Sequence, residues 1–359
     1  MLSSNCPQKC RSMSQFGTSN APRRRPLTLP LGFSIPVTAV ARDDREGQRH
    51  VWTALDTPRK SAKHATRGSN EEFCLAIPAP DTLRPGGNDL SPPPFGAFAP
   101  SAAQQAIISL AHRTRLKRGA FRPMLSRLIN LFRAGPVDTQ YQGAAFRFYH
   151  QASATERGAL FNPDYNLDEL DFLRANTPGG GVFVDVGANV GIYAMVLARH
   201  VGATGRVIAI EPHPLIHARL AFNSAASGYR QVKLIAAAAG DSDGELMIET
   251  DGGNLGASHI ATGASFASNA IRVPSLRLLR ILGDAGVSHV DSLKIDVEGY
   301  EDRVLIGFFR DAPQALWPRA VVIEHLSRNE WLSDCLGDMV SRGYVATGKT
   351  RSNTLLLRQ

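Results

Sequence analysis

From residue 181 onward, short apolar runs alternate with longer stretches in which apolar residues recur every three or four positions. Short runs are typical of buried strands, and the wider spacing is typical of helices that bury one face. The pattern predicts an α/β fold, with a mostly parallel sheet, an antiparallel terminal hairpin and helices on both faces. The expected strands begin at 182 and span 206–212, 232–240, 245–249, 290–299, 320–326, 344–350 and 353–359. The expected helices span 217–227, 273–286, 303–312 and 331–343, and a further one begins at 192. One more expected helix, at 165–176, precedes this region.

The first third of the chain shows a different pattern. Residues 1–100 are rich in Ser, Pro, Arg and Gly without periodicity, which predicts a disordered extension. Met124 precedes a stretch that would form a compact enzyme by itself, so this extension could lie upstream of the true start. Residues 101–139 form a basic amphipathic lead-in, and residues 140–359 form the expected catalytic domain.

Within the lead-in, residues 103–133 interleave apolar and basic side chains. Such a pattern can lie on an anionic membrane surface as a peripheral contact. It also fits a solvated helix whose apolar side packs on the domain, which is the interpretation we favour. No apolar run in the sequence reaches the roughly 18 residues needed to span a bilayer.

Charge and cysteine content narrow the class of protein. Residues 1–135 hold 20 Lys and Arg against 8 Asp and Glu, whereas the whole chain has a net charge of +8. The expected catalytic domain is therefore acidic, which argues against nucleic acid as a partner. The four cysteines show no disulfide or zinc spacing, as in a protein of the reducing cytoplasm.

A glycine-rich loop follows the strand that begins at Val182. Its residues Asp185, Gly187, Asn189 and Gly191 have the order D-x-G-x-N-x-G, not the G-x-G-x-x-G of dinucleotide-binding proteins. A carboxylate at the strand end repels a pyrophosphate but attracts a cation, such as the ammonium and sulfonium of S-adenosylmethionine (SAM). The loop resembles motif I of class I SAM-dependent methyltransferases, and DVGANVGIYA is similar to the form found in the FkbM family.

A second motif, LKIDVEGYE at 293–301, strengthens this resemblance. It places Asp296, Glu298 and Glu301 after a buried strand. Such carboxylates at the carboxyl edge of a parallel sheet are costly unless they face a ligand, a metal or each other. KIDVEGYE resembles the signature of the FkbM family. The resemblance covers about residues 140–359 and implies a Rossmann-like methyltransferase with SAM as its cofactor.

The resemblance also implies which residues hold the cofactor. Asp185, Gly187, Asn189 and Gly191 would form the SAM loop. Glu211, which ends the second strand, would accept hydrogen bonds from the ribose hydroxyls. Asp241 would close the adenine pocket beside the small residues of AAAAG (236–240), although a plain turn aspartate fits there nearly as well.

We expect methyl transfer to a hydroxyl of a sugar, glycan or small-molecule metabolite. Such an acceptor benefits from a base that takes its proton, and Asp296, Glu298 and Glu301 are the candidates, with the first two preferred. Glu324 and His325 are further candidates at the same edge. These carboxylates could instead hold the acceptor or the methionine end of SAM, and we expect no metal because no histidine lies in the cluster.

Alternative functions remain open from the sequence. A catalytically inactive Rossmann-like binding module would fit the fold, but it would be expected to lose the SAM-loop residues. An N-methyltransferase often carries N/D-P-P-Y/F after the fourth strand, where this chain has DVEG. We expect residues 251–270 to cover the acceptor.

Overall fold

The computed structural model describes residues 92–251, 254–260 and 270–359, with the side chains of 92–249 and 270–359. These residues belong to one compact unit, Pro85–Gln359. Most of the expected extension 1–100, with three of the four cysteines, lies outside the described residues, and so does much of the expected cover at 251–270. Residues 92–100 are described, and their contacts are given below.

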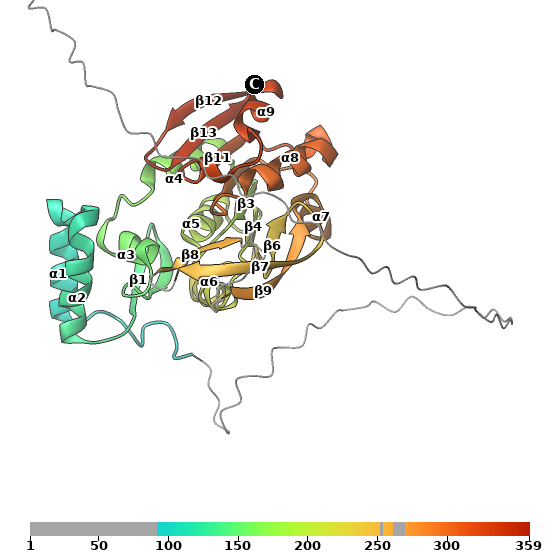
Figure 1. Cartoon of the computed structure of the whole chain (residues 1–359). Coiled ribbons are helices and arrows are strands. Elements are labelled where there is room, and N and C mark those ends of the chain that lie inside the picture. The colour runs from blue at the N-terminus through green and yellow to red at the C-terminus, as the bar shows by residue number, and fades with distance from the viewer. Residues whose placement is uncertain (1–91, 252–253, 261–269) are drawn as a thin grey trace, which may run out of the picture. The chain divides into compact units, whose positions relative to one another are not determined.

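A seven-stranded sheet forms the centre of this unit (Figure 1). Its central strands pair in parallel, and β13 pairs antiparallel with both β11 and β12. The predicted α/β sheet with an antiparallel terminal strand is therefore confirmed. In spatial order the strands are β12 (Tyr344–Lys349), β13 (Asn353–Arg358), β11 (Ala320–Glu324), β10 (Ser292–Ile295), β3 (Val182–Val186), β4 (Arg206–Ile210) and β5 (Val232–Ile235).

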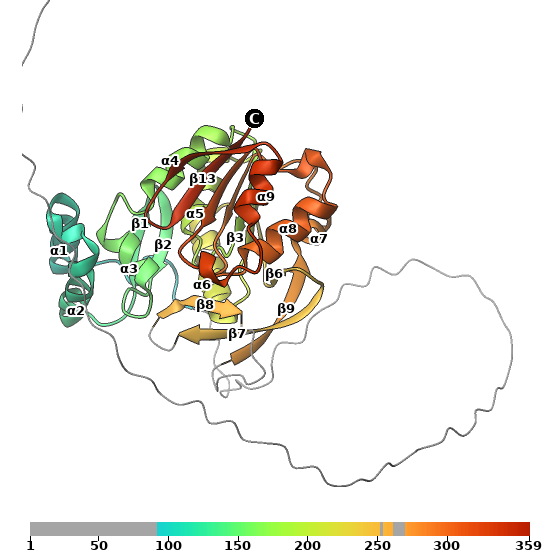
Figure 2. The same cartoon turned by 45° about the horizontal axis from the view of Figure 1, so that its top comes forward.

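Helices cover both faces of this sheet (Figures 1 and 2). The side chains of β3 are buried on both faces of the sheet. Phe183 packs into one core, and Val182, Val184 and Val186 pack into the other. Strands buried on both faces are apolar at nearly every position, as the sequence pattern indicates. The first face is covered by α4 (Leu167–Asn176), α5 (Ile192–Val201) and α6 (Pro214–Ser227), and the second by α7 (Leu278–Asp284), α8 (Glu301–Asp311) and α9 (Cys335–Ser341).

A second, four-stranded sheet changes two of the predicted elements. The expected strand at 232–240 divides into β5 and a short β6 that belongs to this sheet. The expected helix at 273–286 is wrong in its first part, because the chain stays extended to Arg277, where β9 pairs with β6 and β7, and only then becomes α7. The alternating burial of Val273 and Ser275 carries the strand signal. In spatial order the strands are β6 (Ala238–Gly240), β9 (Ala270–Arg277), β7 (Gly244–Asp251) and β8 (Asn254–Ile260).

The lead-in forms two helices that pack on each other and beside α3 (Ala154–Phe161). Ser101 and Gln104 form a capping box that starts the first helix, and Pro123 lies in the first turn of the second. Ile108 and Ile129, one from each helix, belong to the same core as α5. The lead-in and the residues after it form α1 (Ala102–Arg113), α2 (Arg122–Phe132), β1 (Val137–Tyr141), β2 (Ala144–Phe148) and α3 (Ala154–Phe161). Short 3₁₀ turns lie between α1 and α2, at Arg115–Lys117 and Gly119–Phe121, and on either side of β11, at Gln314–Leu316 and Arg328–Glu330.

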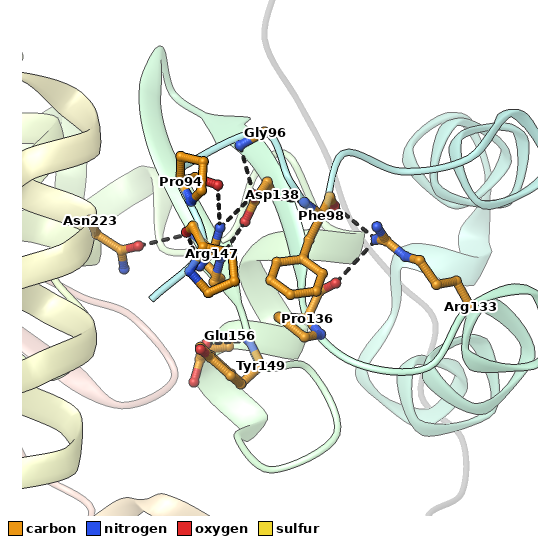
Figure 3. A network of polar contacts seen from close by, with 11 residues as sticks. Pro94, Gly96, Phe98, Arg133, Pro136, Asp138, Arg147, Tyr149, Glu156 and Asn223 are labelled. Atoms are coloured by element: carbon orange, nitrogen blue, oxygen red, sulfur yellow. Dashed lines mark hydrogen bonds and ion pairs between the residues drawn. The ribbon is translucent and has the colours of Figure 1, made fainter. Parts of the chain in front are cut away.

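A buried arginine fastens residues 93–98 to the hairpin β1–β2 (Figure 3). Arg147 binds Asp138 through two hydrogen bonds of 2.7 and 2.9 Å, and it also donates to the carbonyls of Pro93 and Pro94. Asp138 in turn accepts from the backbone N–H groups of Gly96 and Phe98. The pair satisfies its charges within the protein, as burial requires.

We predict that Asp138→Ala lowers the free energy of unfolding by about 3–5 kcal/mol, because it leaves the Arg147 guanidinium buried without its counter-charge. The matched control is Asp171→Ala, whose carboxylate pairs with Arg174 but is 61% exposed. That change should cost less than about 1 kcal/mol. Urea unfolding of both variants measures the difference, and equal losses would contradict this role of Arg147.

Candidate active site

A cleft opens at the carboxyl edge of the central sheet, where β3, β4 and β10 end. Its wall also includes residues of α3, of the approach to α4 and of the turn between β12 and β13. The lining includes Thr155, Tyr165, Asn166, Gly187, Ala188, Asn189, Tyr193, Glu211, Ala238, Ala239, Lys294, Asp296, Val297, Glu298, Ser352 and Asn353. Most of the residues predicted for the cofactor and for catalysis therefore meet in one place.

The loop after β3 has a backbone that favours glycine. Gly187 and Gly191 have φ values of +74° and +93°, and Asn189 has a φ of +52°. A Cβ atom at Gly187 would lie 1.9 Å from the carbonyl oxygen of Asp296. The loops after β3 and β10 thus touch through their backbones, which only glycine permits.

Glu211 lies at the end of β4, beside this loop. Its carboxylate accepts hydrogen bonds of 2.9 Å from the backbone N–H groups of Asn189 and His213. Burial raises the pKa of Glu211 to about 7, against the lowering effect of these two N–H groups. A carboxylate offers about four acceptor positions, so these two bonds leave capacity for further donors.

Lys294 is a residue that sequence reasoning missed. It lies within β10, directly opposite Asp185 of β3, and its side chain is 5% exposed. Its ammonium donates to the Gly187 carbonyl at 2.9 Å, and it lies 3.8 Å from Asp185 Oδ1 and 3.6 Å from Asp296 Oδ2. Lysine is almost never buried unless it is paired, so a lysine inside an apolar strand was the available signal.

The charges around Lys294 keep it protonated. Burial alone would lower the pKa of Lys294, but the nearby carboxylates of Asp296, Asp185 and Glu211 outweigh burial and raise it. The Tyr193 ring adds to this environment, with its centroid 5.2 Å from the ammonium. Among the described residues that line it, the cleft therefore has one buried cation and several carboxylates.

Asp185 lies beneath the cleft and is not among its lining residues. Its Oδ2 accepts a hydrogen bond from the Ala194 N–H in the first turn of α5. No described residue donates a hydrogen bond to its Oδ1, which lies 3.8 Å from the Lys294 ammonium. Burial raises the pKa of Asp185 to about 6, although Lys294 opposes this shift. Asp185 thus joins the end of β3 to α5 and to Lys294 instead of facing the cleft.

The three predicted catalytic carboxylates separate into two roles. Asp296 and Glu298 line the cleft, whereas Glu301 does not. Glu301 is fully buried and accepts hydrogen bonds from the N–H groups of Val297 and Gly299 and from the Trp331 indole. Its contacts fix the turn that carries Glu298.

Glu298 is partly buried near other carboxylates. Its backbone has a φ of +52°. Burial raises its pKa to about 7, and the charges of Asp296, Glu324 and Glu301 raise it further. A base is most effective when its pKa lies near the working pH.

Oxygens of Asp296, Glu301 and Glu324 lie within 4.8 Å of one another, a spacing that could hold a hard metal ion. However, Glu301 is occupied by the three N–H donors described above, and Glu324 accepts from the backbone N–H groups of Leu326 and Ser327. These bonds position both buried carboxylates. Because a carboxylate offers about four acceptor positions, each keeps capacity for a further ligand.

Asp241 lies outside the lining of the cleft. Its side chain is exposed and accepts a 3.0 Å hydrogen bond from the Ser242 hydroxyl. From the same predicted adenine segment, Ala238 and Ala239 do line the cleft. The small residues therefore lie where the sequence predicts an adenine pocket, and the aspartate does not.

Comparison with known proteins supports the class that this fold and cleft define. Residues 185–337 match the model of the methyltransferase FkbM domain. The chain therefore contains an FkbM-family methyltransferase domain, and it is a SAM-dependent methyltransferase. No curated protein matches the chain in sequence.

Three solved structures illustrate the structural likeness. A putative rRNA methylase from Clostridium thermocellum is 11% identical, with 53% of this chain and 91% of that chain covered and a TM-score of 0.35. The O-methyltransferase TomG from Streptomyces achromogenes, solved with SAM, is 15% identical, with 54% and 80% covered and a TM-score of 0.34. M. jannaschii TYW2, solved with AdoMet, is 12% identical, with 62% and 87% covered and a TM-score of 0.31. At these values the likenesses define neither an acceptor nor the role of any residue.

We predict that Gly187→Ala abolishes measurable SAM binding and lowers the melting temperature. The added methyl group would force the loops after β3 and β10 apart, in addition to the strain of a positive φ. The control is Gly202→Ala, because Gly202 has nearly the same φ, +73°, and no atom within 4 Å of the added Cβ. Calorimetric titration and thermal unfolding measure both effects. Equal losses in the two variants would show that the contact with Asp296 has no special importance.

Proposed function

We propose that this methyltransferase transfers the methyl group of SAM to a hydroxyl oxygen of a sugar, a glycan or a small-molecule metabolite. One observation carries the proposal: Asp296 and Glu298, two positions apart in the sequence, both line the cleft, and burial raises the pKa of Glu298 to about 7. A hydroxyl acceptor must lose a proton during the reaction, and such a carboxylate can take it.

The residues of the cleft fit SAM. Gly187 lets the backbone approach a ligand closely, and Glu211 has acceptor capacity for the two hydroxyls of a ribose. Ala238 and Ala239 offer a flat, apolar surface suited to adenine. When bound there, SAM would supply an already activated methyl group, so the protein need only align the acceptor with it.

The residues after β10 would do the proton chemistry. Glu298 would accept the hydroxyl proton, and Asp296, held 3.6 Å from the Lys294 ammonium, would orient the acceptor. Glu301 would act through Glu298 by fixing their shared turn, because its own oxygens are occupied by N–H donors. An acidic cleft of this kind also disfavours a polyanionic acceptor such as nucleic acid.

We predict that Glu298→Gln lowers kcat about 10²–10⁴-fold while leaving the Kd for SAM unchanged, because only proton transfer is lost. In the wild type, the rate should rise as the pH increases through about 7, since only ionised Glu298 acts as a base. Glu298→Gln should remove this rise.

The assay follows radiolabelled methyl transfer from SAM to a panel of sugars and aliphatic alcohols, with a parallel panel of primary amines. Asp296→Asn serves as the comparison. It should raise the KM for the acceptor, and its rate should still rise with pH. Methylation of amines alone, or an unchanged pH profile in Glu298→Gln, would contradict the proposed function.

A further inference from the structure

Helix α2 has two apolar faces, and the described residues of the protein cover only one of them. Leu125 and Ile129 pack into the core. A second row of apolar residues recurs at helical spacing along another side of α2 and its approach, and these residues are exposed. The exposed fractions are 40% for Phe121, 52% for Met124, 38% for Leu128, 82% for Leu131 and 55% for Phe132.

The charge around this row is of one sign. Residues 101–137 contain seven Lys and Arg and no Asp or Glu. Four of the arginines are exposed, and within the described part of the chain no carboxylate lies within ion-pair distance of them: Arg113, Arg115, Arg118 and Arg127. Lys117 differs, because it pairs with Asp164.

We propose that this surface, defined by the five exposed apolar residues of α2 and its approach together with these four arginines, binds peripherally to a membrane that contains anionic lipids. Large exposed apolar side chains next to unpaired cations match the two components of such a membrane, its acyl chains and its negative headgroups. Among the described residues, no helix is long and apolar enough to cross a membrane.

Charge complementarity separates this partner from a second copy of the chain. In a symmetric dimer through α2, the same arginines would meet across the interface, and residues 101–137 offer no carboxylate to neutralise them. An anionic lipid surface supplies that missing charge. The two apolar faces of α2 fit both interpretations of the sequence, because one face packs on the domain and the other is free to contact a membrane surface.

The surface is connected to the cleft through packed elements. Helices α1 and α2 lie at the edge of the unit, next to α3 (Figures 1 and 2). The hydroxyl of Ser126, on α2, lies 2.7 Å from His150 Nδ1, just before α3. Thr155 of α3 lines the cleft. Membrane binding at α2 would therefore place the cleft one helix away from the lipid-bound surface, whichever acceptor it uses.

Co-sedimentation of the full chain with vesicles tests the proposal. The vesicles are phosphatidylcholine alone, or phosphatidylcholine with phosphatidylglycerol. We expect at least about tenfold tighter binding to the anionic vesicles, and weaker binding as the salt concentration rises. The variant Leu128→Glu/Leu131→Glu should lose at least about tenfold in this binding, because its charges would enter the apolar layer.

The matched control is Leu326→Glu/Leu332→Glu, which adds the same charge at side chains that are 63% and 78% exposed elsewhere on the domain. It should bind vesicles like the wild type. Circular dichroism of each variant checks that the fold is intact. All Leu residues changed here are at least partly exposed, so folding should survive.

Three results would overturn the proposal. The wild type could fail to bind anionic vesicles, or the α2 variant and the control could lose binding equally. Sedimentation velocity without lipid could also show a dimer that Leu128→Glu/Leu131→Glu abolishes, which would assign the surface to a second copy. None of these outcomes depends on methyl transfer, so they are distinguishable from failure of the proposed function.

Discussion

The ammonium of Lys294, buried within the central sheet, is the contact on which the cleft depends. It lies between Asp185 on β3 and Asp296 after β10, and it donates to the carbonyl of Gly187 in the loop between β3 and α5. The Asp185 carboxylate is fully buried, and a buried charge without a counter-charge is costly. One lysine therefore fixes the relative position of the two loops that form the cleft.

This constraint explains why the cleft can hold several carboxylates with different roles. Asp185 is fully buried and stabilises the start of α5, whereas Asp296 reaches the cleft and stays close to the cation. Glu211 and Glu298 are farther from a full counter-charge, and burial raises the pKa of each to about 7. Differences in burial and partner thus give similar side chains different environments, on which the proposed binding and proton-accepting roles rest.

The sequence predicts the fold well where hydrophobic periodicity decides the structure. Strand β3 and the loop at Gly187 follow from local pattern, since a buried strand and a positive φ both leave strong signals in residue type. The sequence pattern assigns residues 273–277 to a helix because Val and Leu fit both patterns, and it is pairing with β6 and β7 that makes this segment a strand. The site could be predicted as a set of motifs but not as a set of contacts. Tertiary packing decides the contacts. It brings Glu301 to backbone N–H groups, leaves Asp241 outside the cleft and places Lys294 under Gly187.

The most direct test of this account is calorimetric titration of SAM into the wild type and Lys294→Met, with urea unfolding of both proteins. Lys294→Met should weaken SAM binding at least about tenfold and lower the free energy of unfolding by about 3–5 kcal/mol. The reason is that Asp185 is left buried without the Lys294 ammonium. The double variant Asp185→Asn/Lys294→Met should recover much of the stability, since it removes both charges. A Lys294→Met protein that is as stable as the wild type and binds SAM as tightly would contradict the central role of this lysine.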